Sequence, residues 1–215
     1  MSVEVKICGL STLETVDAAV SAGADMIGLV FFARSPRNVT LDQAASLAAQ
    51  ARGKAKIVTL VVDASDAELR DIVAKVGPDL IQAHGTESPE RIAEIGRLTG
   101  KPVIKAIRVK DAGDIAGASQ FSRVADLILY DAKAPETLGS SLPGGNGHAF
   151  DWELLEGEQR PAFMLAGGLT PENVGEAIRV TGAPVVDVSS GVETAPGIKD
   201  IGLIRKFIEA AKHPR

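Results

Sequence analysis

The chain has 215 residues, a formal net charge of −5, 45% hydrophobic residues and only 4% aromatic ones. A mildly acidic chain without a basic stripe argues against a nucleic-acid partner. No run approaches the ~18 apolar residues that a membrane span needs, and the first residues lack the apolar segment of a signal peptide. The single cysteine, Cys8, excludes an intrachain disulfide. Together these features predict a cytoplasmic protein.

Eight short runs rich in β-branched residues predict strands at residues 3–7, 26–30, 56–62, 80–83, 102–107, 127–130, 163–166 and 184–188. Apolar residues at helical spacing lie between them and predict helices at residues 12–22, 42–51, 66–76, 89–98 and 201–212. A further helix is expected to open at Pro171-Glu172-Asn173, whereas Gly113 and Gly117 interrupt the helical pattern after the fifth run.

Strands that alternate with helices form either an open doubly wound sheet or a closed barrel. Eight units in about 215 residues suit the (β/α)₈ barrel, for which this is close to the minimal length. The first strand is not followed by the G-x-G-x-x-G sequence that a dinucleotide-binding open sheet carries there. We therefore predict an α/β fold, a single (β/α)₈ TIM barrel that takes up residues 1–215 as one domain.

In such a barrel the active site lies at the carboxyl ends of the strands. Alternation along the first strand turns Cys8 toward the barrel axis and lets Glu4 and Lys6 pair below it. By the same alternation Asp131 lies at the end of the sixth strand. Gln82 and His84 lie at the end of the fourth strand, on one face of it. Each of these residues also has an ordinary structural interpretation, such as a buried thiol or a turn residue. A thiol, a carboxyl, an imidazole and an amide around one mouth favour a catalytic site.

Two glycine-containing turns follow the last two strands. Gly167 and Gly168 end the seventh strand, and Ser190 and Gly191 end the eighth. The loops after these two strands form the usual phosphate site of this fold, because glycine lets backbone N–H groups approach phosphate oxygens. The alternative interpretation is that the glycines only make tight turns.

A long segment, residues 131–150, separates the sixth strand from the next helical turn and is rich in glycine and proline. A long irregular segment in a compact domain is usually functional, and we expect it to act as a lid over the site.

Nine stretches in register, spanning residue 5 to about residue 208, resemble the phosphoribosylanthranilate isomerase family. They are Lys6-Ile7-Cys8-Gly9-Leu10, Gly23-Ala24-Asp25, Ser35-Pro36-Arg37, Gln82-Ala83-His84-Gly85, Leu129-Tyr130-Asp131-Ala132, Gly144-Gly145-Asn146-Gly147, Ala166-Gly167-Gly168-Leu169, Glu172-Asn173-Val174 and Asp187-Val188-Ser189-Ser190-Gly191-Val192-Glu193. The chain departs from the family pattern at Asn146, where the lid usually has Thr, and at Ala83, where Leu is usual.

The resemblance implies roles for particular residues. Cys8 matches the general base of the family and Asp131 its general acid, and Arg37 matches the arginine that contacts the anthranilate part of the substrate. Substrate-binding residues are then expected at Gln82, His84, Gly145 and Asn146. The phosphate-binding loops are expected at Gly167, Gly168, Ser190 and Gly191.

The implied reaction is an Amadori rearrangement of a small phosphorylated aminosugar, N-(5-phosphoribosyl)anthranilate, in tryptophan biosynthesis. It needs an acid that keeps its proton and a thiol that gives its proton up, but no metal and no organic cofactor. The protein is expected to work as a monomer or a homodimer. Two alternatives stay open: an isomerase that also accepts the related aminoaldose of histidine biosynthesis, and a catalytically silent barrel that binds phosphosugars.

Overall fold

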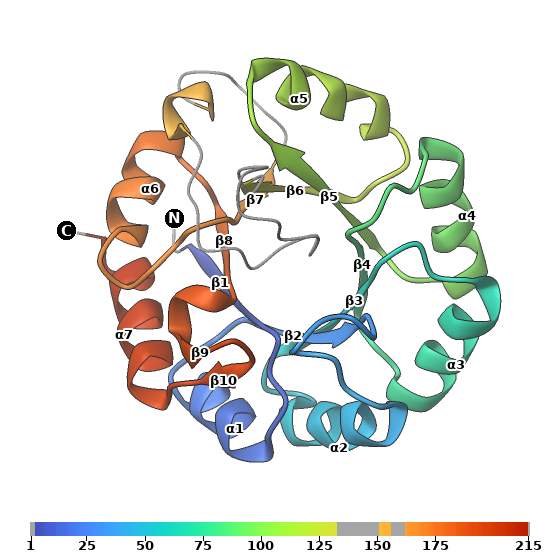
Figure 1. The fold of residues 1–215 in the computed structure, drawn as a ribbon, viewed down its shortest axis with the longest axis horizontal. Coiled ribbons are helices and arrows are strands. Elements are labelled where there is room, and N and C mark those ends of the chain that lie inside the picture. The colour runs from blue at the N-terminus through green and yellow to red at the C-terminus, as the bar shows by residue number, and fades with distance from the viewer. Residues whose placement is uncertain (1–2, 133–150, 156–161, 215) are drawn as a thin grey trace.

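The computed structural model describes residues 3–132, 151–155 and 162–214 of the chain. Eight parallel strands are hydrogen-bonded in chain order, and the eighth returns to the first (Figure 1). The strands are β1 (Glu4–Cys8), β2 (Met26–Phe31), β3 (Lys56–Val61), β4 (Leu80–Ala83), β5 (Val103–Val109), β6 (Leu127–Ala132), β7 (Phe163–Leu165) and β8 (Val185–Val188). The predicted closed (β/α)₈ barrel is confirmed.

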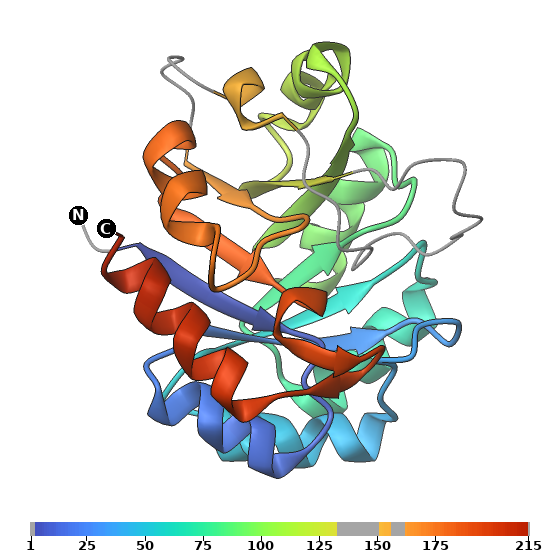
Figure 2. The ribbon, with the colours of Figure 1, turned by 60° about the vertical axis from the view of Figure 1, so that its left-hand side comes forward.

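Helices form the outer layer around the strands (Figure 1). The helices are α1 (Leu13–Ser21), α2 (Leu41–Ala51), α3 (Asp66–Val76), α4 (Pro89–Thr99), α5 (Ala112–Gly117), α6 (Val174–Thr181) and α7 (Ile201–Lys212). Short 3₁₀ turns are η1 (Ala118–Phe121), η3 (Trp152–Leu155) and η4 (Ser190–Val192), and a small hairpin, β9 (Glu193–Ala195) with β10 (Ile198–Lys199), follows β8 (Figure 2). Among the described residues, no helix has both the length and the apolar character that a membrane crossing requires.

Side-chain caps explain where most helices begin. Thr40 and Ser65 accept hydrogen bonds from backbone N–H groups three residues later, and Gln43 and Glu68 return the contact to complete capping boxes. Replacing such a cap costs about 1 kcal/mol. The helix expected to open at Pro171 begins instead at Val174, because the side-chain oxygen of Asn173 accepts from the Thr170 backbone N–H and holds a turn there.

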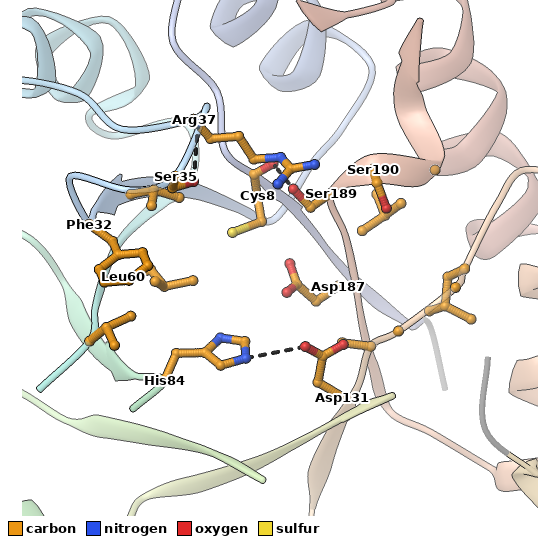
Figure 3. A pocket seen from close by; sticks show the side chains of 18 residues that line it. Cys8, Phe32, Ser35, Arg37, Leu60, His84, Asp131, Asp187, Ser189 and Ser190 are labelled. Atoms are coloured by element: carbon orange, nitrogen blue, oxygen red, sulfur yellow. Dashed lines mark hydrogen bonds and ion pairs between the residues drawn. The ribbon is translucent and has the colours of Figure 1, made fainter. Parts of the chain in front are cut away.

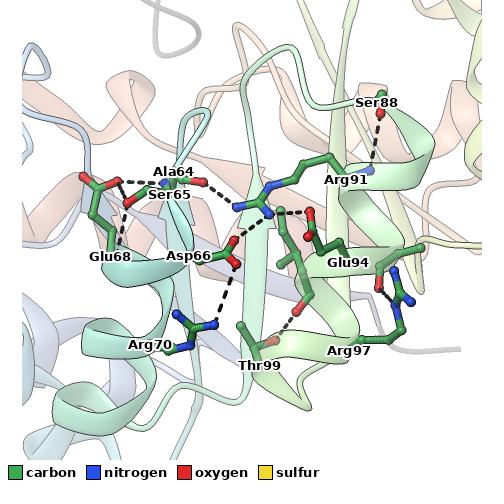
Figure 4. A network of polar contacts seen from close by, with 12 residues as sticks. Ala64, Ser65, Asp66, Glu68, Arg70, Ser88, Arg91, Glu94, Arg97 and Thr99 are labelled. Atoms are coloured by element: carbon green, nitrogen blue, oxygen red, sulfur yellow. Dashed lines mark hydrogen bonds and ion pairs between the residues drawn. The ribbon is translucent and has the colours of Figure 1, made fainter.

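Polar contacts also tie α3 to α4 (Figure 4). The Arg91 guanidinium donates to Asp66 Oδ1 at 2.7 Å and to the Ala64 carbonyl at 2.8 Å. Arg91 therefore joins the amino-terminal ends of two neighbouring helices at the mouth of the barrel.

The barrel wall separates two apolar regions. Outward-facing residues such as Val5, Ile7 and Leu29 pack against the helices, while Met26, Val58, Ile104, Leu129 and Met164 fill the inside. The expected pairing of Glu4 with Lys6 is wrong. Lys6 donates to Asp187 Oδ1 at 2.9 Å, and Glu4 lies 3.6 Å from Lys56. The reason is the register, since Lys6 and Asp187 are direct neighbours across the β1–β8 seam.

Candidate active site

A pocket opens at the carboxyl ends of the strands (Figure 3). Its walls come from both halves of the chain. The lining residues are Cys8, Val30, Phe32, Ser35, Arg37, Leu60, Val62, His84, Asp131, Ala166, Gly167, Gly168, Leu169, Asp187, Val188, Ser189, Ser190 and Gly191. Most residues expected at the site from the sequence therefore lie around one cavity.

Cys8 is the last residue of β1 and is 3% exposed. It packs with Val30 and Leu60 inside the mouth of the barrel. Burial raises the pKa of the Cys8 thiol above its ordinary value, because the thiolate loses its hydration, while Lys6 acts in the opposite direction. A thiol in this position needs a nearby cation to become a base.

Asp131 lies on β6, on the other side of the pocket from Cys8 in the view of Figure 3. The predicted strand stops at Tyr130, two residues before the observed end of β6 at Ala132. Asp131 is therefore inside the strand, paired with Arg108 of β5, which fixes its backbone. Asp131 Oδ2 lies 3.2 Å from His84 Nε2. The acid is thus held by the strand below it and by an imidazole beside it.

Gln82 lies behind His84 and does not line the pocket. Its Nε2 is 3.1 Å from His84 Nδ1. With the Gln82 amide nitrogen as the donor, His84 Nδ1 accepts, and Nε2 is then the ring nitrogen that can donate to Asp131. Gln82 Oε1 is buried without a hydrogen-bond partner among the described residues.

Arg37 reaches the pocket from the loop after β2 and is 6% exposed. Its Nε and Nη2 donate to the two carboxylate oxygens of Glu193, each at 2.7 Å. Lys199 Nζ adds a third contact to Glu193 at 2.7 Å. Burial raises the pKa of Glu193, but Arg37 and Lys199 outweigh that effect and hold it below its usual value. Glu193 thereby holds one edge of the Arg37 guanidinium, the edge with Nε and Nη2, and leaves Nη1 to face other groups.

The glycine turns after β7 and β8 are dictated by close packing. Gly167 and Gly168 have φ of 85° and 65°, which favour glycine. A Cβ on Gly167 would collide with the backbone nitrogen of Ala132, and one on Gly191 would collide with the Leu169 carbonyl oxygen. Packing alone explains these glycines, so a phosphate role rests on their place in the pocket wall.

Several functional candidates escaped the sequence analysis. Ser189 donates to the Cys8 carbonyl at 3.2 Å, and Lys199 donates to the Ser189 carbonyl at 2.9 Å. Burial lowers the pKa of Lys199 despite its contact with Glu193. Asp187 lines the pocket as well. The available signal was a charged residue inside the Val185–Val188 strand, in the same alternation that singled out Cys8.

Two expected substrate-binding residues, Gly145 and Asn146, lie outside the described residues, as does most of the expected lid. Within the described part of the chain, no group of three or more His, Cys, Asp or Glu side chains could hold a metal ion.

Comparisons with known proteins address the identity of this site. Residues 5–210 match the family model described as N-(5'-phosphoribosyl)anthranilate (PRA) isomerase. An enzyme of that name from Rhodopseudomonas palustris (strain BisA53) is 55% identical over 213 residues, which cover 99% of this chain and 97% of the relative. One from Paramagnetospirillum magneticum is 52% identical over the full length of both chains.

Solved structures agree with the sequence relatives. The phosphoribosyl anthranilate isomerase from Thermotoga maritima has a TM-score of 0.86 at 35% identity, with 98% of both chains covered. A crystal structure of such an enzyme in complex with reduced 1-(o-carboxyphenylamino)-1-deoxyribulose 5-phosphate has a TM-score of 0.84 at 33% identity, again with 98% of both chains covered. With a family match over nearly its whole length, this chain belongs to the N-(5'-phosphoribosyl)anthranilate isomerase family.

Proposed function

We propose that Cys8 and Asp131 are the general base and the general acid of this isomerase of tryptophan biosynthesis. The observation that carries the proposal is their placement: they stand on β1 and β6 and line the same pocket. Among the described residues that line the pocket, four side chains are suited to proton transfer near neutral pH: Cys8, Asp131, His84 and Asp187.

The reaction converts N-(5-phosphoribosyl)anthranilate into 1-(2-carboxyphenylamino)-1-deoxyribulose 5-phosphate. Asp131 donates its proton to the furanose ring oxygen, the ring C–O bond breaks, and an iminium forms at C1. The Cys8 thiolate then removes the proton from C2, and the resulting enolamine tautomerises to the ketone. Each step moves a proton between a positioned side chain and the substrate.

The substrate is thus a small phosphorylated aminosugar, and the pocket offers complementary groups at two places. We assign the phosphate to the turns with Gly167, Gly168, Ser190 and Gly191, where backbone N–H groups can donate to its oxygens. We assign the anthranilate carboxylate to Arg37, through the guanidinium hydrogens that Glu193 leaves available.

His84 and Gln82 have different proposed roles in substrate binding. His84 lines the pocket and can contact the substrate, whereas Gln82 acts through His84, whose ring nitrogen it contacts. Because the pocket draws on β1 and β8 alike, we infer that residues 1–215 act as one catalytic domain. A free Cys8 thiol also suits a reducing compartment such as the cytoplasm.

Loss of the fluorescent anthranilate adduct, followed with the purified protein, tests the proposal. Cys8→Ser and Asp131→Asn should each lower kcat by about 10²–10⁴-fold with little change in KM, because each removes a proton-transfer group. Asp126→Asn is the matched control, since Asp126 precedes the same strand at the opposite end of the barrel. Near-normal kcat in Cys8→Ser or in Asp131→Asn contradicts the assigned role.

A further inference from the structure

Lys6 is fully buried inside the barrel and has no part in the mechanism described so far. Its Nζ donates to Asp187 Oδ1 at 2.9 Å, and the side chains of the pair are 0% and 8% exposed. A buried ion pair is weak evidence for stability, because the cost of removing both charges from water is comparable to the attraction between them. The position of Lys6 therefore calls for another explanation.

The ammonium group of Lys6 lies beside the sulfur of Cys8. Both face Gly28 on β2: a Cβ built there would lie 2.8 Å from Cys8 Sγ and 3.1 Å from Lys6 Nζ. Both atoms therefore lie close to the same position next to Gly28, and a side chain larger than that of glycine would displace them. Gly28 is the direct neighbour of Cys8 in the β1–β2 register, so the arrangement is built into the barrel wall.

We propose that Lys6 is a positioning residue that stabilises the Cys8 thiolate, and that Asp187 limits how much of the Lys6 charge the sulfur experiences. The proposal deepens the proposed function, since it rests on Cys8 as the general base. It gives the buried pair a task, because a thiolate next to an ammonium is the form of cysteine that accepts a proton.

The surroundings of Cys8 determine the direction of each effect. Burial raises the pKa of Cys8 most, Lys6 lowers it, Asp187 raises it, and Lys199 lowers it less than Lys6 does. From strands β2 and β3, the uncharged residues Gly28, Val30 and Leu60 lie next to the sulfur. His84 and Asp131 are the titratable groups on the far side of the pocket. Although burial lowers the pKa of Lys6, Asp187 and Cys8 hold it above its ordinary value, so Lys6 stays charged while the thiol ionises.

The test is a titration of the thiolate by its ultraviolet absorbance, with Cys8→Ser as the blank. Cys8 is the only cysteine, so the signal has one source. Lys6→Met should raise the titration midpoint by about one pH unit or more, as expected when a neighbouring opposite charge is lost. Asp187→Asn should lower the midpoint, and Lys6→Arg should stay near the wild type because the charge is retained.

Opposite shifts from the two halves of one ion pair are the decisive result, because a purely structural role predicts no such opposition. An unchanged midpoint in Asp187→Asn, or a shift of both variants in the same direction, overturns the proposal. If Lys6→Met does not fold, the double variant Lys6→Met/Asp187→Asn replaces it, since it leaves no unpaired buried charge. Its midpoint should lie above that of the wild type, because Lys6 affects Cys8 more than Asp187 does, and a midpoint at or below the wild-type value also overturns the proposal.

The pH profile of kcat/KM provides a second readout. In Lys6→Met the rising limb should move to higher pH by the same amount as the thiolate titration. The two proposals fail separately: full activity in Cys8→Ser removes Cys8 as the base but leaves the thiolate titration valid as a test of Lys6.

Discussion

At the scale of single residues, Arg37, which we propose binds the substrate carboxylate, is held in place by other parts of the fold. Its guanidinium is held by Glu193 through two parallel hydrogen bonds, a geometry that a lysine cannot reproduce. Glu193 in turn binds Lys199, which contacts Ser189 at the start of the turn after β8. The orientation of Arg37 is therefore linked to the loop after β8.

We predict that Arg37→Lys raises KM at least about tenfold, because a lysine keeps neither the two-atom contact with Glu193 nor the planar fork that we propose binds the substrate carboxylate. Arg34→Lys is the control, since Arg34 is exposed and stacks 5.0 Å from the ring centre of Phe32. Steady-state kinetics of both variants decide the matter. Equal and small effects on KM would return Arg37 to a structural role.

His84 offers a second test at this scale. Its Nε2 lies 3.2 Å from Asp131 Oδ2, and a misplaced catalytic group can cost about 10²-fold in rate. We therefore expect His84→Ala to lower kcat by about tenfold to a hundredfold if its main task is to hold Asp131. If its main task is to bind substrate, KM rises instead and kcat stays near normal. His213→Ala, at the end of α7, is the matched control.

Sequence alternation identified Cys8, His84 and Asp131 because all three depend only on which face of a strand a residue occupies. It misassigned the partner of Lys6 and missed Glu193. Lys6–Asp187 and Arg37–Glu193 join residues 181 and 156 positions apart. Such pairs depend on strand register and loop conformation, neither of which a local pattern contains.

At the scale of elements, the amino ends of the strands carry a repeated clamp. An aspartate just before an even-numbered strand accepts a hydrogen bond from a backbone N–H at the start of the preceding strand, and its own N–H donates to the carbonyl of that same residue. The pairs are Asp25 with Val5, Asp79 with Ile57 and Asp126 with Val103, with side-chain distances of 2.7, 2.7 and 2.8 Å. The clamp fixes β1 to β2, β3 to β4 and β5 to β6.

We predict that Asp79→Ala lowers the free energy of unfolding by about 1–2 kcal/mol, the range for one hydrogen bond to a partly exposed carboxylate. Asp79→Asn should lose less, because its side-chain oxygen still accepts. Asp71→Ala, an exposed position in α3, serves as the control. Urea denaturation measures all three, and an Asp79→Ala variant as stable as the control would show that the clamp contributes nothing.

Element boundaries were predictable where the chain carries its own signals. The helices at Asp66–Val76 and Ile201–Lys212 have side-chain caps at Ser65 and Asp200, and they begin and end where the pattern predicts. The start of α6 was not predictable, because Asn173 uses its side chain to hold the turn after β7, where it donates to the Gly168 carbonyl at 2.9 Å. The contacts of Asn173 within this turn therefore set where α6 begins.

At the scale of the whole molecule, the barrel closes by joining the first strand to the last. Lys6–Asp187 spans the β1–β8 seam, and Lys212 at the end of α7 donates to Asp25 at 2.7 Å. Helix α7 also packs against α1 and α6 (Figure 2). Cys8, the proposed general base, and the buried Lys6 therefore lie at the junction on which closure depends, and their ionisation is coupled to the stability of the fold.

That coupling predicts a loss of stability at alkaline pH. The folded state raises the pKa of Cys8 through burial, whereas an unfolded thiol ionises near its ordinary pKa of about 8.5. Between these two values the folded chain binds one more proton than the unfolded chain, so a rise in pH favours unfolding. The pKa of Lys6 is raised as well, and the stability that this contributes is likewise lost only as pH rises, above the ordinary lysine value of about 10.4.

Urea unfolding at about pH 7.5 and pH 9.5 should therefore show a larger drop in the wild type than in Cys8→Ser, because a hydroxyl does not ionise in this range. One group contributes at most about 1.4 kcal/mol for each pH unit, so a difference of about 1 kcal/mol between the two drops is expected. Comparing the drops removes the direct effect of the substitution on stability. Equal drops would mean that Cys8 ionises as readily in the folded barrel as in the unfolded chain, and that burial at the β1–β8 seam does not control its charge.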